Sequence, residues 1–276
     1  ITITKYACFH KKPKIRYTSA MISMVSLKQQ KLPKLIVILG STASGKSNLA
    51  YKLCEEFCGY IISADSRQFY KGLDIATAKW SAEDRITRKN NTLLINNIPH
   101  YLIDFLEPTE RFSAAEFQHE VQKIIHTTKG VPFLVGGTGL YISAVVDNFI
   151  FPKGPPHSEI RKTLEQENYA TLLAKLQKLD QKSAEILGPQ KNKRRVIRAI
   201  EVCMVSGQPF SEQKTKDKPL YNALQIGLQW EKHALYERIH KRADAQLAQG
   251  LIEEITTLAK QYPSIPEAFN AIGCKE

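Results

Sequence analysis

The sequence predicts an α/β fold in which a parallel sheet is flanked by helices and interrupted by a mostly helical insertion. Two observations lead to this class. Short apolar runs at 35–39, 60–63 and 132–135 alternate with helical patterns, as expected for parallel strands joined by helical crossovers. After residue 140 the character changes, because residues 158–206 have a helical pattern almost throughout.

The elements of the first half follow from apolar runs and capping signals. In chain order we expect a strand at 35–39, a helix at 47–57, strands at 60–63 and 101–103, a helix at 113–127 and a strand at 132–135. The helix at 113–127 has the clearest start, because Ser113 and Glu116 have the spacing of a capping box.

In the second half, helices predominate and one more strand is expected. The helical pattern of 158–206 breaks at Gly188-Pro189 and ends at Gly207. A strand is predicted at 224–228, and a long helix follows at 233–261 with an interruption at Gly250.

We divide the chain into a basic extension at 1–33, a core made of 34–140 and 220–276, and a helical insertion at 141–219. The extension has seven Lys or Arg residues and no Asp or Glu. One interpretation is a transit peptide, and another is a stretch translated ahead of a start at Met21 or Met24. We favour an extension that is disordered or artefactual.

Charge and cysteine content narrow the class of partner and compartment. Lys and Arg number 39 against 27 Asp and Glu, which gives a net charge of +12. Such an excess would attract a partner that carries many phosphates, although a basic, soluble surface is the simpler interpretation. The five cysteines form no CxxC pair, which suits a reducing cytoplasm. No apolar run approaches the roughly 18 residues of a membrane span, so we expect no membrane association.

The motif that identifies the core lies directly after the first strand. It reads Gly40-Ser-Thr-Ala-Ser-Gly-Lys-Ser47, a GxxxxGK[ST] pattern between a predicted strand and a predicted helix. We therefore expect a P-loop NTPase-like parallel sheet core that binds a diphosphate or triphosphate. Loop amides and the positive end of the helix would face the phosphates. The phosphate-binding residues are expected to be Gly40, Ser41, Thr42, Ala43, Ser44, Gly45, Lys46 and Ser47, with the Ser47 hydroxyl on Mg²⁺.

A second group of polar residues follows the second strand. Asp65 is followed by Ser66, Arg67 and Gln68, at the sheet edge where ligands bind in doubly wound folds. Asp65 could hold Mg²⁺, act as a general base or cap the next helix. The strand at 132–135 ends in two glycines and Thr138 without a carboxylate, which argues against a motor that hydrolyses ATP.

A basic cluster lies in the helical insertion. Lys191, Lys193, Arg194, Arg195 and Arg198 fall within eight residues. Apolar residues recur between them at helical spacing, so one face would pack while the arginines form a positive strip. A charge run is usually a solvated face, but in a chain of charge +12 this one favours contact with nucleic acid.

Together these motifs resemble the tRNA dimethylallyltransferase family, also called tRNA isopentenyltransferases. The resemblance runs from about Leu32 to the end of the chain, and it rests on the P-loop and on stretches at 65–79, 100–104, 112–117, 134–141, 194–202, 235–239 and 250–254. The departures include Ser41, Ala76, Trp80 and Lys232 at positions where the family usually has Pro, Gly, Pro and Arg. Family members also continue past the position of Glu276 with a basic helix that contacts tRNA, so the resemblance implies that this segment is missing.

The resemblance implies a transferase that moves the dimethylallyl group of dimethylallyl diphosphate to N6 of the adenosine 3′ of the tRNA anticodon. It implies that Asp65 accepts the N6 proton and that Thr42 lies at the bridging oxygen of the leaving group, with Mg²⁺ as cofactor. It also implies contacts with tRNA from Asp65, Ser66, Arg67, Gln68, Thr138, Arg194, Arg195, Val196, Ile197 and Arg198. We expect a cytoplasmic monomer.

Two other functions remain open from the sequence. A P-loop kinase of a nucleotide or small metabolite would explain the P-loop and a helical lid, but not the charge of +12. A non-catalytic RNA-binding protein would explain the charge, but the intact Lys46, Ser47 and Asp65 argue against it.

Overall fold

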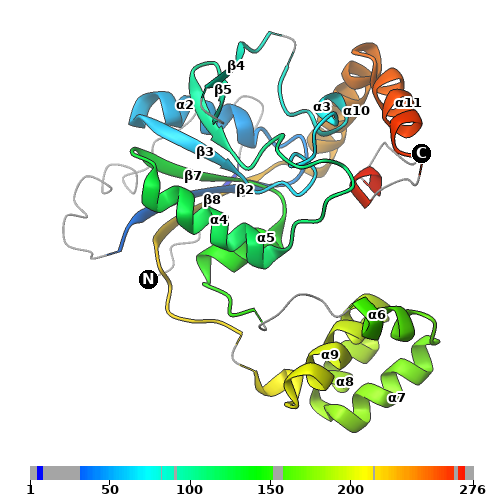
Figure 1. Ribbon diagram of the computed structural model, residues 1–276. Helices are drawn as coiled ribbons and strands as arrows, with labels where there is room; N and C mark the ends of the chain where they lie inside the picture. Colours follow the sequence, from blue (N-terminus) through cyan, green and yellow to red (C-terminus); the bar gives the residue numbers. More distant parts are fainter. Residues whose placement is uncertain are drawn as a thin grey trace. The chain divides into compact units, whose positions relative to one another are not determined.

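The computed structural model describes residues 5–8, 32–81, 83–89, 92–151, 158–213, 215–263 and 267–270 (Figure 1). The chain divides into two compact units, one formed by Ile1–Asn148 and Lys218–Glu276 and the other by Phe149–Asp217. We describe each unit by itself.

The first unit is built on a sheet that has eight strands in the described part of the chain. The strands are β1 (Lys5–Cys8), β2 (Lys34–Gly40), β3 (Gly59–Ser63), β4 (Ile86–Lys89), β5 (Thr92–Ile95), β6 (Ile98–Tyr101), β7 (Val131–Gly136) and β8 (Asn222–Gln229), in the order β1-β8-β2-β7-β3-β6-β5-β4. The first six strands in this order, β1, β8, β2, β7, β3 and β6, are parallel to one another. The last two, β5 and β4, pair antiparallel. The predicted α/β class with a mostly parallel sheet is therefore confirmed.

Helices cover both faces of this sheet because its central strands are apolar on both sides. Ile36 and Ile38 of β2 pack with α2 (Lys46–Phe57). Leu35 and Val37, which alternate with them, face α4 (Ala114–Thr127) and α5 (Gly139–Val146). Figure 1 shows α4 and α5 on the face opposite α2.

Two helix boundaries confirm the capping signals in the sequence. Ser113 accepts a hydrogen bond from the Glu116 amide while the Glu116 carboxylate accepts one from the Ser113 amide, which completes a capping box. The predicted long helix is two helices, α10 (Lys232–Ala248) and α11 (Leu251–Gln261), because Gly250 adopts φ 97° between them.

The third strand and the start of the insertion differ from the predictions. The strand expected at 101–103 is β6, which ends at Tyr101 because Leu102 adopts a left-handed φ of 53°. It is paired through an Asn96-Asn97 turn, with both φ values positive, to a strand that the sequence analysis missed. The second unit begins after α5, because Tyr141, Ile142 and Val145 lie in the core of the first unit. In the extension at 1–33, for which disorder was expected, residues 5–8 form β1 by pairing with β8, and residues 1–4 and 9–31 lie outside the described residues.

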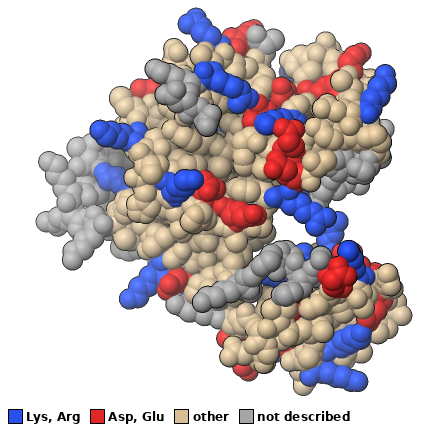
Figure 2. All heavy atoms as spheres, viewed as in Figure 1, with Lys and Arg blue, Asp and Glu red and all other residues tan. Residues whose placement is uncertain are grey.

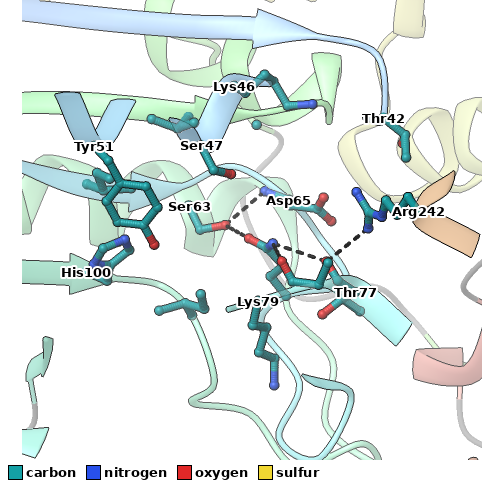
Figure 3. Close-up of a pocket in the computed structure, with 16 residues that line it drawn as sticks. Thr42, Lys46, Ser47, Tyr51, Ser63, Asp65, Thr77, Lys79, His100 and Arg242 are labelled. Carbon is teal, nitrogen blue, oxygen red and sulfur yellow. Dashed lines mark hydrogen bonds between the residues drawn. The ribbon is translucent and has the colours of Figure 1, made fainter. Parts of the chain in front are cut away.

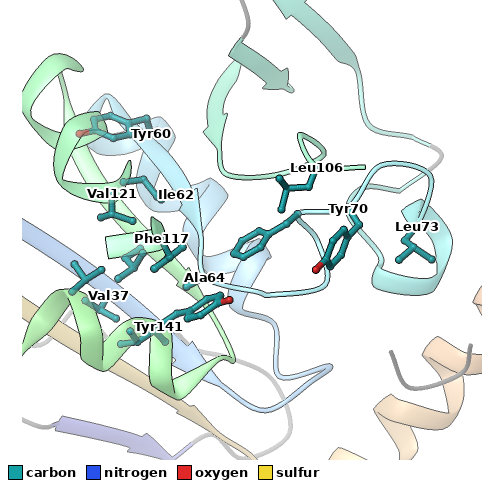
Figure 4. Close-up of a cluster of buried hydrophobic side chains, with 14 of the residues drawn as sticks. Val37, Tyr60, Ile62, Ala64, Tyr70, Leu73, Leu106, Phe117, Val121 and Tyr141 are labelled. Atoms are coloured by element: carbon teal, nitrogen blue, oxygen red, sulfur yellow. The ribbon is translucent and has the colours of Figure 1, made fainter. Parts of the chain in front are cut away.

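An aromatic cluster fixes the loop that follows β3. Phe69 stacks on Phe117 and Tyr141, with ring centres 5.9 Å and 5.7 Å apart. Figure 4 shows Phe117 and Tyr141 close to Ala64, just before Asp65. The carbonyl of Phe69 also accepts hydrogen bonds from the amides of Phe105 and Leu106. The chain after β3 is therefore anchored on both sides of Asp65.

The second unit is helical. It contains α6 (Ser158–Glu165), α7 (Tyr169–Leu179), α8 (Gln181–Leu187), the 3₁₀ turn Gly188–Gln190, α9 (Lys193–Ser206) and the 3₁₀ turn Phe210–Glu212. Its core includes Leu172, Leu176, Val196 and Ile200. The predicted breaks at Gly188-Pro189 and Gly207 are confirmed. No helix in the described ranges is long and apolar enough to cross a membrane.

Candidate active site

Three neighbouring parallel strands end at one edge of the sheet, and their loops form the site. β2 leads into the P-loop, β7 into Gly136-Gly137, and β3 into Asp65. A Cβ on Gly136 would lie 2.2 Å from the carbonyl oxygen of Ala64, so only glycine allows this approach. Thr138 joins the loops further, since its hydroxyl accepts a hydrogen bond from the Ser66 amide at 3.2 Å.

Lys46 extends along its own loop. Its ammonium donates to the carbonyl oxygens of Gly40 at 3.0 Å and Ser41 at 2.8 Å. Burial lowers the pKa of Lys46, while the nearby charge of Asp65 opposes that shift. Figure 3 shows the Lys46, Ser47, Asp65 and Thr42 side chains around one pocket. The structure therefore brings three of the expected phosphate-binding residues, Thr42, Lys46 and Ser47, together with Asp65.

Asp65 is held in a turn of its own chain. Its Oδ1 accepts a hydrogen bond from the Arg67 amide at 3.0 Å, and its carbonyl accepts one from the Gln68 amide at 3.2 Å. The first bond engages the carboxylate and the second the main chain, and the half-buried carboxylate lines the pocket.

The Gln68 amide group links this turn to the segment that follows α3 (Asp74–Thr77). Its Oε1 accepts from the Ser63 hydroxyl at 2.9 Å, and its Nε2 donates to the carbonyl oxygens of Thr77 and Ala78. The Gln68 side chain is thus engaged within the protein, where its hydrogen bonds position the pocket wall.

Arg242 is a pocket residue that the sequence analysis missed. It lies on α10 and lines the pocket with Thr42 and Asp65 (Figure 3). Burial lowers the pKa of Arg242, and Asp65 opposes the shift. Arg238, Lys241 and Arg242 line an adjoining cavity of about 480 Å³ with the P-loop. The signal was present in the sequence, because these cations at spacings of three and four residues share one helix face.

The far wall of the pocket is neutral and partly aromatic. His100 is buried, and its Nδ1 lies 2.8 Å from the Ile98 carbonyl oxygen, which fits an Nδ1–H donor. Burial lowers the pKa of His100 to about 4, so the ring is uncharged at neutral pH. The Tyr51 ring lies 5.4 Å from it, and burial raises the pKa of Tyr51. The His100 and Tyr51 rings therefore add no positive charge to the pocket.

Below the pocket, a buried ammonium ties three segments together. Lys79 donates to the Asp74 and Asp104 carboxylates at 2.7 Å and 2.6 Å and to the Tyr70 carbonyl at 2.6 Å. Its side chain is inaccessible to solvent. Because all three bonds are internal, we assign Lys79 to holding the pocket wall and not to binding a ligand.

Oxygen donors for a divalent cation are present at the P-loop. The Ser47 side chain is exposed at the start of α2, and the Asp65 carboxylate lines the same pocket. Hydroxyl and carboxylate oxygens suit Mg²⁺ when phosphate oxygens complete its coordination. Within the described ranges, no group of three or more His, Cys, Asp or Glu residues could hold a metal ion by itself.

The arginines of the basic cluster in the second unit differ in exposure. Arg194 and Arg195 are exposed on α9, and Arg195 donates to the Gln190 side chain at 2.6 Å. Arg198 instead pairs with Glu201, whose carboxylate is buried and also binds Arg161. Val196 and Ile197 lie in the core of the unit, so their side chains pack inside the protein. Figure 2 shows basic side chains at the surface of both units.

Comparisons with known proteins agree with one another. The family model described as IPP transferase matches residues 68–276. The tRNA dimethylallyltransferase of Halothermothrix orenii is 43% identical over 254 residues, covering 88% of this chain and 74% of that protein. The one from Trichormus variabilis is 39% identical over 246 residues, covering 89% of this chain and 80% of that protein.

The similar solved structures are transferases of the same kind. The full-length tRNA isopentenylpyrophosphate transferase of Bacillus halodurans is similar with a TM-score of 0.58 and 37% identity, over 88% of this chain and 75% of that one. A eukaryotic dimethylallyltransferase acting on tRNA is similar with a TM-score of 0.68 and 28% identity, over 83% of this chain and 56% of that one.

Proposed function

This chain belongs to the IPP transferase family, and we propose that it transfers a dimethylallyl group from dimethylallyl diphosphate to N6 of the adenosine at tRNA position 37, 3′ of the anticodon. The products are N6-isopentenyladenosine and diphosphate. The observation that carries the proposal is the shared pocket, in which Lys46 and Thr42 of the P-loop lie with Asp65. A site for the diphosphate and a proton acceptor for the amine are what this reaction requires.

The P-loop and α10 would bind the leaving group. As the allylic C1–O bond breaks, negative charge builds on the diphosphate, and fixed donors stabilise that charge. The P-loop amides, Lys46 and Arg242 are the donors that line this part of the pocket. Thr42, which is exposed at the loop, would donate its hydroxyl to the bridging oxygen.

Asp65 would act as the general base. An exocyclic amine is a weak nucleophile because its lone pair is delocalised into the purine ring. As N6 attacks C1, one N6 proton passes to the Asp65 carboxylate and the diphosphate leaves with the electron pair of the C1–O bond. Oδ1 already accepts from the Arg67 amide, which would orient the carboxylate toward the amine.

We propose Mg²⁺ as the cofactor, held by the Ser47 hydroxyl and the diphosphate oxygens with Asp65 close by. When bound, it would supply positive charge to the leaving group. Because the donors on the protein are hydroxyl and carboxylate oxygens, they suit this ion better than a softer metal.

The RNA contacts are proposed to come from both units. Arg194 and Arg195 present exposed cations on α9, while Ser66, Arg67 and Thr138 lie beside the pocket. The target base would have to leave its stack to reach Asp65, so base flipping is part of the proposal. We further propose a monomeric, cytoplasmic enzyme, in keeping with the free thiols of Cys54, Cys58 and Cys203.

The test is to incubate the purified chain with unmodified tRNA, Mg²⁺ and radiolabelled dimethylallyl diphosphate, and to count label on the RNA. We expect label on the adenosine 3′ of the anticodon, and Lys46→Ala should weaken donor binding because it removes the ammonium at the loop. Failure to label tRNA, with ATP turned over in the presence of a small acceptor, would favour a P-loop kinase instead. Binding of tRNA without turnover of either substrate would favour an RNA-binding protein.

A further inference from the structure

Two side chains distant in sequence hold the main chain of the P-loop. Trp230 follows β8, and its indole Nε1–H donates to the carbonyl oxygen of Ser44 at 2.8 Å. Arg238 on α10 donates through Nε to the carbonyl oxygen of Ala43 at 2.7 Å. The guanidinium lies over the indole, 4.3 Å from the ring centre, so each side chain orients the other.

The loop needs this support because its conformation is costly. Ala43 adopts φ 59° and the neighbouring Gly45 φ 93°. A residue with a Cβ is rare in that left-handed region and remains there only where its surroundings determine it. The bonds from Arg238 and Trp230 to the carbonyl groups of Ala43 and Ser44 help to determine it.

Four carbonyl groups of the loop fall into two sets. Those of Gly40 and Ser41 accept from the Lys46 ammonium, which a bound diphosphate would attract. Those of Ala43 and Ser44 accept from Arg238 and Trp230. An anion site needs its amides toward the ligand and its carbonyl oxygens away from it, and the second set can keep its donors after the ligand arrives.

We propose that Trp230 is a positioning residue for the diphosphate. Its indole N–H fixes the Ser44 carbonyl and thereby the direction of the loop amides, without touching the substrate. The inference rests on the proposed function, since it takes the diphosphate end of the donor as the ligand of the P-loop.

Trp230→Phe tests the role of the N–H because phenylalanine keeps an aromatic ring over Arg238. The loss of one neutral hydrogen bond corresponds to a factor of about 3 to 10 in binding. We expect the KM for dimethylallyl diphosphate to rise by about that factor, with kcat and the KM for tRNA unchanged within about twofold. The affinity for inorganic pyrophosphate, measured by calorimetry, should fall by the same factor.

Tyr236→Phe is the matched control, because it removes a hydroxyl from an exposed aromatic residue on α10. Its pyrophosphate affinity should equal that of the unaltered chain. A folded Trp230→Phe variant with unchanged pyrophosphate affinity would overturn the inference. This holds also if the variant has lost thermal stability. Weakened pyrophosphate binding in a chain that labels no tRNA would support the inference while the proposed function fails.

A second measurement covers the case in which Trp230→Phe does not fold. The chain has two tryptophans, so Trp80→Phe assigns the indole N–H signal of Trp230 in a nitrogen–proton spectrum. Coupling between two bonds is reciprocal, so pyrophosphate should slow exchange of that N–H with solvent by about the same factor of 3 to 10. An exchange rate that pyrophosphate leaves unchanged would contradict the positioning role.

Discussion

Replacing Glu254 with glutamine is predicted to destabilise the pocket wall from a distance. Glu254 lies on α11, and its Oε2 accepts hydrogen bonds from the amides of Asp74 at 3.0 Å and Ile75 at 2.8 Å. Its Oε1 accepts from the Ala76 amide at 3.0 Å. These amides belong to the first turn of α3, where no helical carbonyl is available to them.

The size of the effect follows from the three bonds. A hydrogen bond to a charged acceptor contributes about 1.5–3 kcal/mol, and a neutral one about 0.5–1.5 kcal/mol. Glutamine keeps one acceptor oxygen, while its NH₂ group faces an amide that is itself a donor. Because the α3 residues are half-buried and water can partly replace the lost bond, we expect Glu254→Gln to lower the free energy of unfolding by about 2 kcal/mol.

The same change should affect the reaction. The carbonyl oxygen of Thr77, at the end of α3, accepts from both Gln68 and Arg242, so a loosened α3 misplaces two side chains of the pocket. We expect kcat/KM to fall about tenfold. Urea unfolding followed by tryptophan fluorescence measures the stability, because both tryptophans lie in the first unit.

Glu253→Gln is the control for Glu254→Gln, since Glu253 is an exposed neighbour on the same helix. It should change stability by less than about 0.5 kcal/mol. If Glu254→Gln changed stability no more than Glu253→Gln does, the reasoning from the three amides would be refuted.

Three further predictions concern the base, the RNA contact and the second unit. Asp65→Ala should lower the single-turnover rate about 10²-fold or more, and an active variant would exclude the base role. Arg194→Ala with Arg195→Ala should weaken tRNA binding and reduce its salt slope by about 1.5, whereas an unaltered slope would place the contact elsewhere. For Asp180, burial raises the pKa, but hydrogen bonds from Ser183 and Ser211 outweigh it and lower the pKa from 3.8 to about 2. Asp180 therefore contributes about 2 kcal/mol to the free energy of unfolding above pH 4, and this contribution is lost as pH falls toward 2. Unfolding followed by circular dichroism should show Asp180→Asn to be less stable than the unaltered chain at pH 7 and equally stable near pH 2. A difference in stability that persists at pH 2 would disprove this.

The parts of the fold that depend on local patterns could be predicted from the sequence. The P-loop is recognisable because glycine spacing, strand and helix occur within one short segment. Asp65 is identifiable because it follows a strand, and parallel strands end at a common edge. The capping box at Ser113 and the break at Gly250 likewise depend only on residues close together in the sequence.

Contacts between distant segments could not be predicted in this way. Trp230 reaches Ser44 across 186 positions and Arg242 reaches Thr77 across 165. Periodicity places Arg242 on a helix but does not say which loop the helix covers, and it gives no contact for Trp230, which lies between β8 and α10. Val196 and Ile197 illustrate the converse, because the resemblance implied RNA contacts at these positions and their side chains fill the core.

The bonds between Lys46 and its own loop bear on how the enzyme would empty its site. Product diphosphate resembles the donor's head group, so a loop that bound this group without compensation would be slow to release it. The Lys46 ammonium also has partners within the protein, the carbonyl oxygens of Gly40 and Ser41. Under the proposed function, departure of the product would exchange one set of hydrogen bonds for another and would leave no buried charge without a partner. The P-loop would then be suited to turnover as well as to binding.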